Sequence, residues 1–239
     1  MTTTHAPDSI SPSHGDLTSR SLGPLLREIR ACTLCAARLP KPPRPVLQAH
    51  PAARILIAGQ APGRKVDCSG IPFDDASGDR LRLWMGVDND TFYDPTLIAI
   101  VPMGFCYPGT GASGDLPPRP ECAPAWRDRV LGALPRIELT LAIGQYAQAW
   151  HLGRRARIGV TETVRAWRDH WPGVLPLPHP SPRNNIWLRR NPWFDEEVIP
   201  ALRARVRLLL DVASGAGGPD RSPVGVSRSL QRLRAMPAP

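Results

Sequence analysis

Short, continuously apolar runs alternate along this chain with longer segments in which apolar residues recur at helical spacing. Four such runs, at 54–59, 97–101, 139–143 and 174–177, are apolar throughout or nearly so, as strands covered on both faces are. Helices are predicted between and after them, at 78–85, 123–134, 146–151, 161–169 and 193–212. This alternation predicts an α/β fold, a three-layer α/β/α arrangement around a small central parallel sheet.

The carboxyl ends of the strands are where we expect a ligand, because parallel α/β sheets bind ligands outside that edge. Two loops reach it. In the turn 59–63, Gly59 and Gly63 let the backbone approach a bound group and Pro62 stiffens the turn. The loop 179–185 follows the last strand. Topology alone therefore predicts that these two loops face one site.

The predicted domain spans 19–212 and begins with a helix capped by Ser19 or Ser21. Residues 1–18 lack periodicity and are expected to form a disordered tail. Residues 213–239, rich in Gly, Ser, Pro and Arg, are expected to form a flexible basic tail. Five prolines make the segment 39–51 extended, and 104–124 is expected to be a long loop.

The composition points to a polyanionic partner. The net charge is +9, with 30 basic and 21 acidic residues, which favours nucleic acid first and an anionic membrane surface second. Basic tails alone are the alternative source of this charge. No apolar run approaches a membrane span and the N-terminus has no secretory pattern, so we expect a cytoplasmic protein without a membrane partner. We also expect it to be a monomer.

Four of the five cysteines form a group. Cys32 and Cys35 are separated by two residues, and Cys106 and Cys122 bracket a proline-rich loop. Four thiolates suit either zinc or an iron–sulfur cluster, and reduced thiols without metal are the third possibility. The spacing alone leaves these open. Cys68 stands apart from the group and is expected to be a plain small residue.

The motifs resemble those of the uracil-DNA glycosylase superfamily, best those of its iron–sulfur families 4 and 5. The resemblance covers roughly residues 20–211 and its residues stand in the family order: Gly59-Gln60-Ala61-Pro62-Gly63, Gly70-Ile71-Pro72-Phe73, Ser77-Gly78 and His179-Pro180-Ser181. The cysteines match the cluster pattern of the same families. The resemblance therefore implies a [4Fe–4S] cluster held by Cys32, Cys35, Cys106 and Cys122.

The resemblance implies a DNA repair enzyme that flips uracil out of DNA and hydrolyses its N-glycosidic bond, leaving an abasic site. A protein of the same fold that binds uracil or abasic DNA without turnover is the alternative. An iron–sulfur redox or regulatory module is a third hypothesis, but nothing else in the sequence indicates electron transfer.

The resemblance also assigns the pocket residues. His179 is the expected donor to uracil O2, and Phe73 the expected ring that stacks on the base. The remaining turn and loop residues expected to contact the base are Gly59, Ala61, Pro62, Gly63 and Ser181. Phe73 in the core and a structural His179 are the plainer interpretations.

The catalytic acid departs from the family pattern. Gln60 stands where family 4 has Glu, and Ala61 stands where family 1 has a catalytic Asp. Gln60 remains a candidate catalytic residue. Asp75 fills the place of a family 5 Asp and is the expected group that positions water or stabilises the cationic sugar; Asp67 and Asp74 are alternatives. A helix N-cap is the plainer role for Asp75.

Two further features concern the substrate. Pro102 stands near the place of the Asn that reads uracil in strict families, which implies a wider range of deaminated bases or reading through the backbone. The loop after His179 is expected to enter DNA, and the residues expected to contact it are Arg183, Asn184, Asn185 and Arg190. A solvated basic loop is the alternative.

Overall fold

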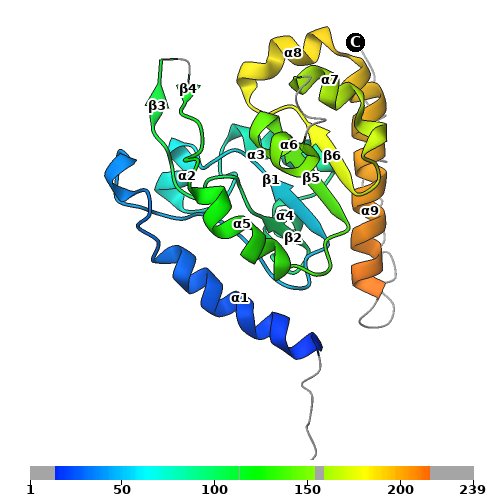
Figure 1. Cartoon of the computed structure of the whole chain (residues 1–239). Helices are drawn as coiled ribbons and strands as arrows, with labels where there is room; N and C mark the ends of the chain where they lie inside the picture. The colour runs from blue at the N-terminus through cyan, green and yellow to red at the C-terminus, as the bar shows by residue number, and fades with distance from the viewer. Residues whose placement is uncertain (1–13, 113, 154–158, 216–239) are drawn as a thin grey trace, which may run out of the picture.

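The computed structural model describes residues 14–112, 114–153 and 159–215. Its centre is a four-stranded parallel sheet in the order β2-β1-β5-β6 (Figure 1). The strands are β1 (Ile55–Ala58), β2 (Ile98–Ile100), β5 (Leu139–Ile143) and β6 (Val174–Leu177). All four lie within the predicted runs, which confirms the three-layer α/β/α fold.

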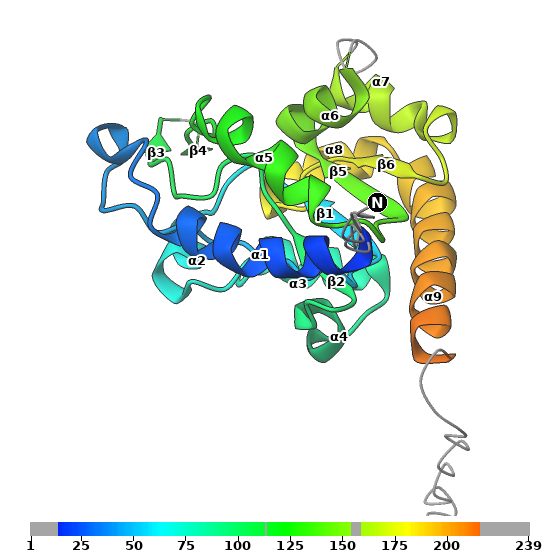
Figure 2. The same cartoon turned by 60° about the horizontal axis from the view of Figure 1, so that its bottom comes forward.

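Alternate residues of β1 point into two different cores, as side chains of a strand must. Ile55 and Ile57 belong to a core with α3 (Ala76–Met85), α4 (Asn89–Tyr93) and α9 (Ile199–Gly215). Leu56 belongs to a core with α1 (His14–Arg30) and α5 (Cys122–Gly132). Figures 1 and 2 show α1 and α5 side by side, away from α9. Both faces of the sheet are therefore covered.

Several short elements of the structure were not predicted from the sequence. They are the helices α2 (Arg64–Ser69), α4 and α8 (Asn185–Arg190), and an antiparallel hairpin of β3 (Thr110–Gly111) and β4 (Gly114–Asp115) inside the predicted loop 104–124. Each is too short to show a helical or strand period. The remaining helices α6 (Gly144–Leu152) and α7 (Val160–Arg165) match predicted ones, while α9 follows a π-helical turn, Phe194–Val198.

The first helix begins earlier than predicted. Because α1 starts at His14, neither Ser19 nor Ser21 is its cap, and residues 14–18 are helical rather than disordered. The polar composition that suggested a tail does not oppose a helix, and no proline lies between His14 and Gly23 to interrupt one. The rest of the predicted tails, 1–13 and 216–239, lies outside the described residues.

The proline-rich segment is extended, as predicted, and it also covers a sheet edge. Gln48 exchanges backbone hydrogen bonds with Ile100, with N···O distances of 2.9 and 2.7 Å. Its side-chain amide donates to the carbonyl of Ile98 at 2.8 Å. The free edge of β2 is thereby paired, which prevents association through that edge. No helix within the described ranges has the length and apolar content to cross a membrane.

Arg127 is fully buried and fixes the end of β2. Its Nη1 donates to the carbonyls of Val101 and Pro102 at 2.6 and 2.9 Å, and its Nη2 lies 2.8 Å from Nε2 of His151. Arginine only donates, so Nε2 of His151 accepts. Burial and the nearby guanidinium lower the pKa of His151 to about 4. The guanidinium of Arg127 thus binds backbone carbonyls at the carboxyl end of β2, the edge where a ligand is expected.

Replacing Arg127 tests this anchor. Arg127→Met leaves two buried carbonyls without a donor, so we expect the free energy of unfolding to fall by about 1–3 kcal/mol in urea titrations. Arg129→Met is the matched control on the same helix, because Arg129 forms an exposed ion pair with Glu28 and should change stability by less than about 1 kcal/mol. Equal stability of the two variants would contradict the anchoring role.

Candidate active site

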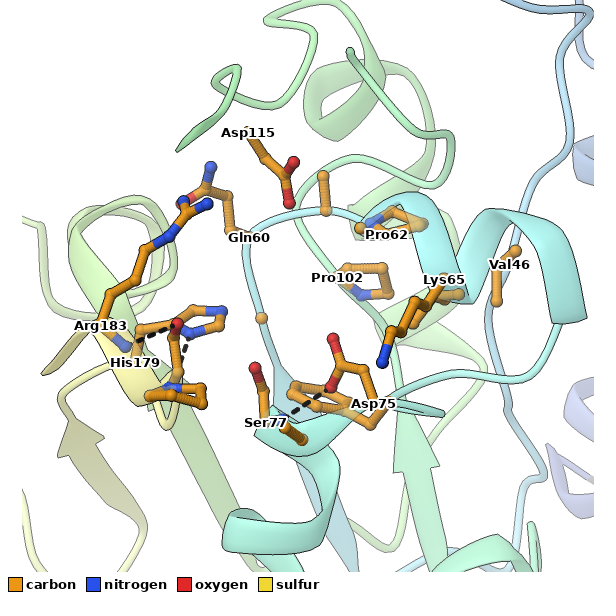
Figure 3. A pocket seen from close by; sticks show the side chains of 18 of the residues that line it. Val46, Gln60, Pro62, Lys65, Asp75, Ser77, Pro102, Asp115, His179 and Arg183 are labelled. Atoms are coloured by element: carbon orange, nitrogen blue, oxygen red, sulfur yellow. Dashed lines mark hydrogen bonds between the residues drawn. The ribbon is translucent and has the colours of Figure 1, made fainter. Parts of the chain in front are cut away.

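A pocket of about 460 Å³ lies at the carboxyl ends of β1 and β6 (Figure 3). It is bounded by the turn after β1, the start of α3, the end of β2, the β3–β4 hairpin and the loop after β6. The structure brings these predicted site residues together in its lining: Gly59, Gln60, Ala61, Pro62, Gly63, Phe73, Asp75, His179, Ser181, Arg183 and Asn184. Asn185 and Arg190 do not line it.

Phe73 forms part of the pocket wall and is held in a strained backbone conformation. Its φ is 55°, the left-handed region that bulky residues avoid. A methyl group on Gly59 would lie 3.3 Å from Cζ of Phe73, so the absence of a side chain at 59 makes room for the ring. Phe73 also contacts Phe92 edge-on in the core. It therefore combines a pocket position with the core contact of the plainer interpretation.

Asp75 caps α3 and lines the pocket at the same time. Its Oδ1 accepts the backbone N–H groups of Ser77 and Gly78 at 2.9 and 3.0 Å, the N-cap interaction. This leaves Oδ2 for the pocket, where Figure 3 shows the carboxylate. The alternative Asp67 is buried and paired with Lys41 at 3.1 Å, outside the pocket lining.

The hydrogen bonds of His179 define its tautomer. The backbone N–H of Ser181 donates to Nδ1 at 3.2 Å, so in the neutral ring the proton lies on Nε2. Burial lowers the pKa of His179, while the negative charges of Asp75 and Asp115 oppose that shift. The amide of Asn184 donates to the His179 carbonyl at 2.7 Å. The ring is thus a neutral donor at the pocket.

Gln60 and the hairpin meet at the pocket rim. The side-chain amide of Gln60 donates to the carbonyl of Leu116 at 3.3 Å, and the adjacent Asp115 lines the pocket. Sequence reasoning missed Asp115, because its position depends on the unpredicted hairpin. Glycines at 111 and 114 flank the turn and were the available signal. Gln60 therefore has a structural partner, whereas Asp115 brings a carboxylate to the pocket.

The wall at Pro102 offers little to read a base. Pro102 has no N–H, and its carbonyl accepts from Arg127. The next backbone N–H groups are also taken, because Met103 donates to Gly59 at 2.8 Å and Gly104 to Gln60 at 2.9 Å. The N–H groups of Met103 and Gly104 are therefore occupied and are not free to donate to a base.

Hydrogen bonds from Arg80 of α3 hold the loop after β6. Nη1 of Arg80 donates to the carbonyl of Ser181 at 3.1 Å, and Nη2 to Oδ1 of Asn185 at 2.7 Å. The side chain of Asn185 is therefore occupied within the protein. Arg183 and Arg190 are exposed, and Arg183 packs against Gly114 of the hairpin. The hairpin and this loop thus approach each other over the pocket.

The four grouped cysteines line a second, small pocket. Cys32, Cys35, Cys106 and Cys122 surround it together with Arg119. Burial raises the pKa of the Cys106 thiol to about 11 and that of Cys122 to about 12. Within the described residues, no three Cys, His, Asp or Glu side chains are grouped so as to hold a metal ion. Cys68 is exposed and apart, as expected.

Titration of His179 by nuclear magnetic resonance tests this arrangement. We expect the Nε2–H tautomer at neutral pH and a pKa below 6.5. Asp75→Asn removes a negative charge that favours the imidazolium, so it should lower the pKa further. Asp128→Asn, on the exposed side of α5, is the control and should leave the titration unchanged. An Nδ1–H tautomer would contradict the assigned hydrogen bonds.

A comparison with known protein families matches the part of the chain that contains the sheet, the turn after β1 and the loop after β6. The family described as "Uracil DNA glycosylase superfamily" matches residues 48–203. This range contains β1, β2, β5 and β6 and every residue that lines the large pocket apart from Val46. The chain belongs to the uracil DNA glycosylase superfamily.

Proposed function

We propose that this protein hydrolyses the N-glycosidic bond of uracil in DNA and leaves an abasic site. The observation that carries the proposal is the pairing across one pocket of a neutral His179, with its proton on Nε2, and the carboxylate of Asp75 (Figure 3). A departing base needs a hydrogen-bond donor, and the sugar it leaves needs a nearby negative charge.

The proposed reaction uses both groups at the stage where charge develops. As the C1′–N1 bond breaks, its electron pair goes to uracil, and Nε2–H of His179 donates to the forming anion at O2. The sugar becomes cationic, and the Asp75 carboxylate stabilises it. Phe73 stacks on the base after the base has flipped out of the DNA duplex. A water oxygen then bonds to C1′ and completes hydrolysis.

The base range is proposed to be wider than uracil. Pro102 offers no amide, and the neighbouring backbone N–H groups are occupied. Discrimination between bases by hydrogen bonding from this wall is therefore absent, and a site without such groups rejects analogues weakly. Other deaminated bases are proposed substrates of the same pocket.

A uracil-containing oligonucleotide tests the function, with abasic sites detected as strand breaks after alkali. We expect breaks with the wild-type protein and a rate lower by about 100-fold or more with Asp75→Asn. Asn still caps a helix, so this variant removes charge rather than fold. Asp88→Asn is the matched control, since Asp88 caps α4 away from the pocket, and it should keep the wild-type rate.

Absence of strand breaks with the wild-type protein would contradict the proposed glycosylase activity. If the same inactive protein binds abasic DNA tightly, the alternative of a binding protein without turnover replaces it. The two readouts use one preparation, so the enzyme and the binding protein are separated directly.

DNA contacts are proposed for the loop after β6 and the end of α8. Arg183 and Arg190 are exposed and have charge available for phosphates. Asn184 and Asn185 are proposed to act through the loop, because their side chains already bind His179 and Arg80. They would keep the loop in shape when DNA binds.

A [4Fe–4S] cluster on Cys32, Cys35, Cys106 and Cys122 is proposed as a structural group. The donor set fits, since four thiolates hold such clusters. Nε of Arg119 is buried without a hydrogen bond, forms an ion pair of 3.7 Å with Glu121 and lies beside these thiols, where it would donate to cluster or thiolate sulfur. Zinc fits less well, because Zn–S bonds of about 2.3 Å require sulfurs in mutual contact. Among the described residues, no three Cys, His, Asp or Glu side chains are grouped closely enough to hold a single ion.

Iron and acid-labile sulfide analysis of anaerobically purified protein tests the cluster. We expect about four iron atoms per chain and broad visible absorption, both lost in Cys106→Ser. Cys68→Ser is the control and should keep the iron. A colourless protein that carries zinc, or no metal, would contradict the proposal.

A further inference from the structure

We propose that Asp115 is a second catalytic carboxylate of the pocket and takes the proton of the attacking water. The inference rests on the proposed hydrolysis and adds to it a residue outside the motifs. Asp115 belongs to β4 of the hairpin, 52 positions after the turn residue Gly63 in the sequence.

The two carboxylates converge on one point beside the turn. A methyl group on Gly63 would lie 3.2 Å from Oδ2 of Asp115 and 3.9 Å from Oδ2 of Asp75. Both negative charges also act on His179. Figure 3 shows Asp115 beside Gln60 in the upper part of the view, with His179 and Asp75 below them on opposite sides. Three chemically active groups from separate elements therefore face the same space.

A chain of hydrogen bonds orients Asp115. The hydroxyl of Thr110 donates to Oδ1 of Asp115 at 3.3 Å, and the buried Tyr107 hydroxyl lies 2.5 Å from the same Thr110 oxygen. Since Thr110 gives its only proton to Asp115, Tyr107 donates to Thr110. Gln60 holds the next residue, Leu116, through its carbonyl. These contacts fix Oδ1 and leave Oδ2 toward the turn.

The surroundings of the two carboxylates assign them different tasks. Asp75 accepts two backbone N–H groups at the start of α3, which hold its carboxylate in one position beside the pocket. Asp115 accepts one long hydrogen bond from a hydroxyl and is exposed at the mouth, where water enters. Paired carboxylates in unlike environments commonly divide their roles in this way. Asp75 stabilises the sugar, and Asp115 accepts the proton.

The proton balance of the step is complete. The C1′–N1 bond breaks and its electron pair leaves with the base as an anion. The water oxygen bonds to C1′ while one of its protons passes to Oδ2 of Asp115. That proton then returns to solvent as the base anion takes one up. One water is consumed, and no oxidant or further reactant is needed.

Single-turnover excision from a uracil-containing oligonucleotide tests the role of Asp115. Asp115→Asn should slow excision by about 100-fold, with unchanged affinity for an oligonucleotide carrying a tetrahydrofuran abasic analogue. Asp94→Asn is the matched control, because Asp94 also accepts a threonine hydroxyl but lies outside the pocket lining. Added formate should restore part of the rate of Asp115→Ala, since it supplies a diffusible proton acceptor, and none of the rate of Asp94→Ala.

The outcomes separate this inference from the proposed function. Wild-type excision with an unaffected Asp115→Asn overturns the role of Asp115 alone. A slow Asp115→Asn that loses affinity for the abasic analogue to the same degree, with no rescue of Asp115→Ala by formate, also overturns it. No excision by the wild-type protein overturns the proposed function itself.

Discussion

The parallel pairing of β1 with β2 on one side and β5 on the other is the constraint on which the rest of the structure depends. Ile55 is in register with Ile98 and with Leu139, so every backbone group of this central strand has a partner strand available. All four β1 residues are buried. The strand can therefore exist only when helices cover both faces, and its carboxyl end is carried to the shared edge.

Hydrogen bonds behind that edge hold the pocket wall in place. Arg127 holds the carbonyls that follow β2, and the N–H groups of Met103 and Gly104 hold the turn after β1. Gly104 also lines the cysteine pocket, so the segment 102–106 separates the two sites. A group bound by the cysteines would contact this segment and would support the pocket wall from the other side.

One helix serves both sides of the pocket. α3 receives its N-cap from Asp75 and, one turn later, sends Arg80 to the loop that follows His179. Asp75 and the loop after β6 are therefore both hydrogen-bonded to α3. This explains how a cap residue, the plainer role for Asp75, is compatible with a chemical role: the helix N-terminus fixes one oxygen and leaves the other to the pocket.

The sequence by itself determined the layers, the sheet edge and most of the pocket. Buried parallel strands are apolar throughout, so β5 and β6 lie at the predicted residues, and the motifs of the turn and of the His179 loop are local. The features that depend on long-range contacts were decided only by the tertiary structure. The hairpin, the occupied side chain of Asn185 and the entry of Asp115 into the pocket had no periodic signal, because two-residue strands and single side chains are positioned by partners far along the chain.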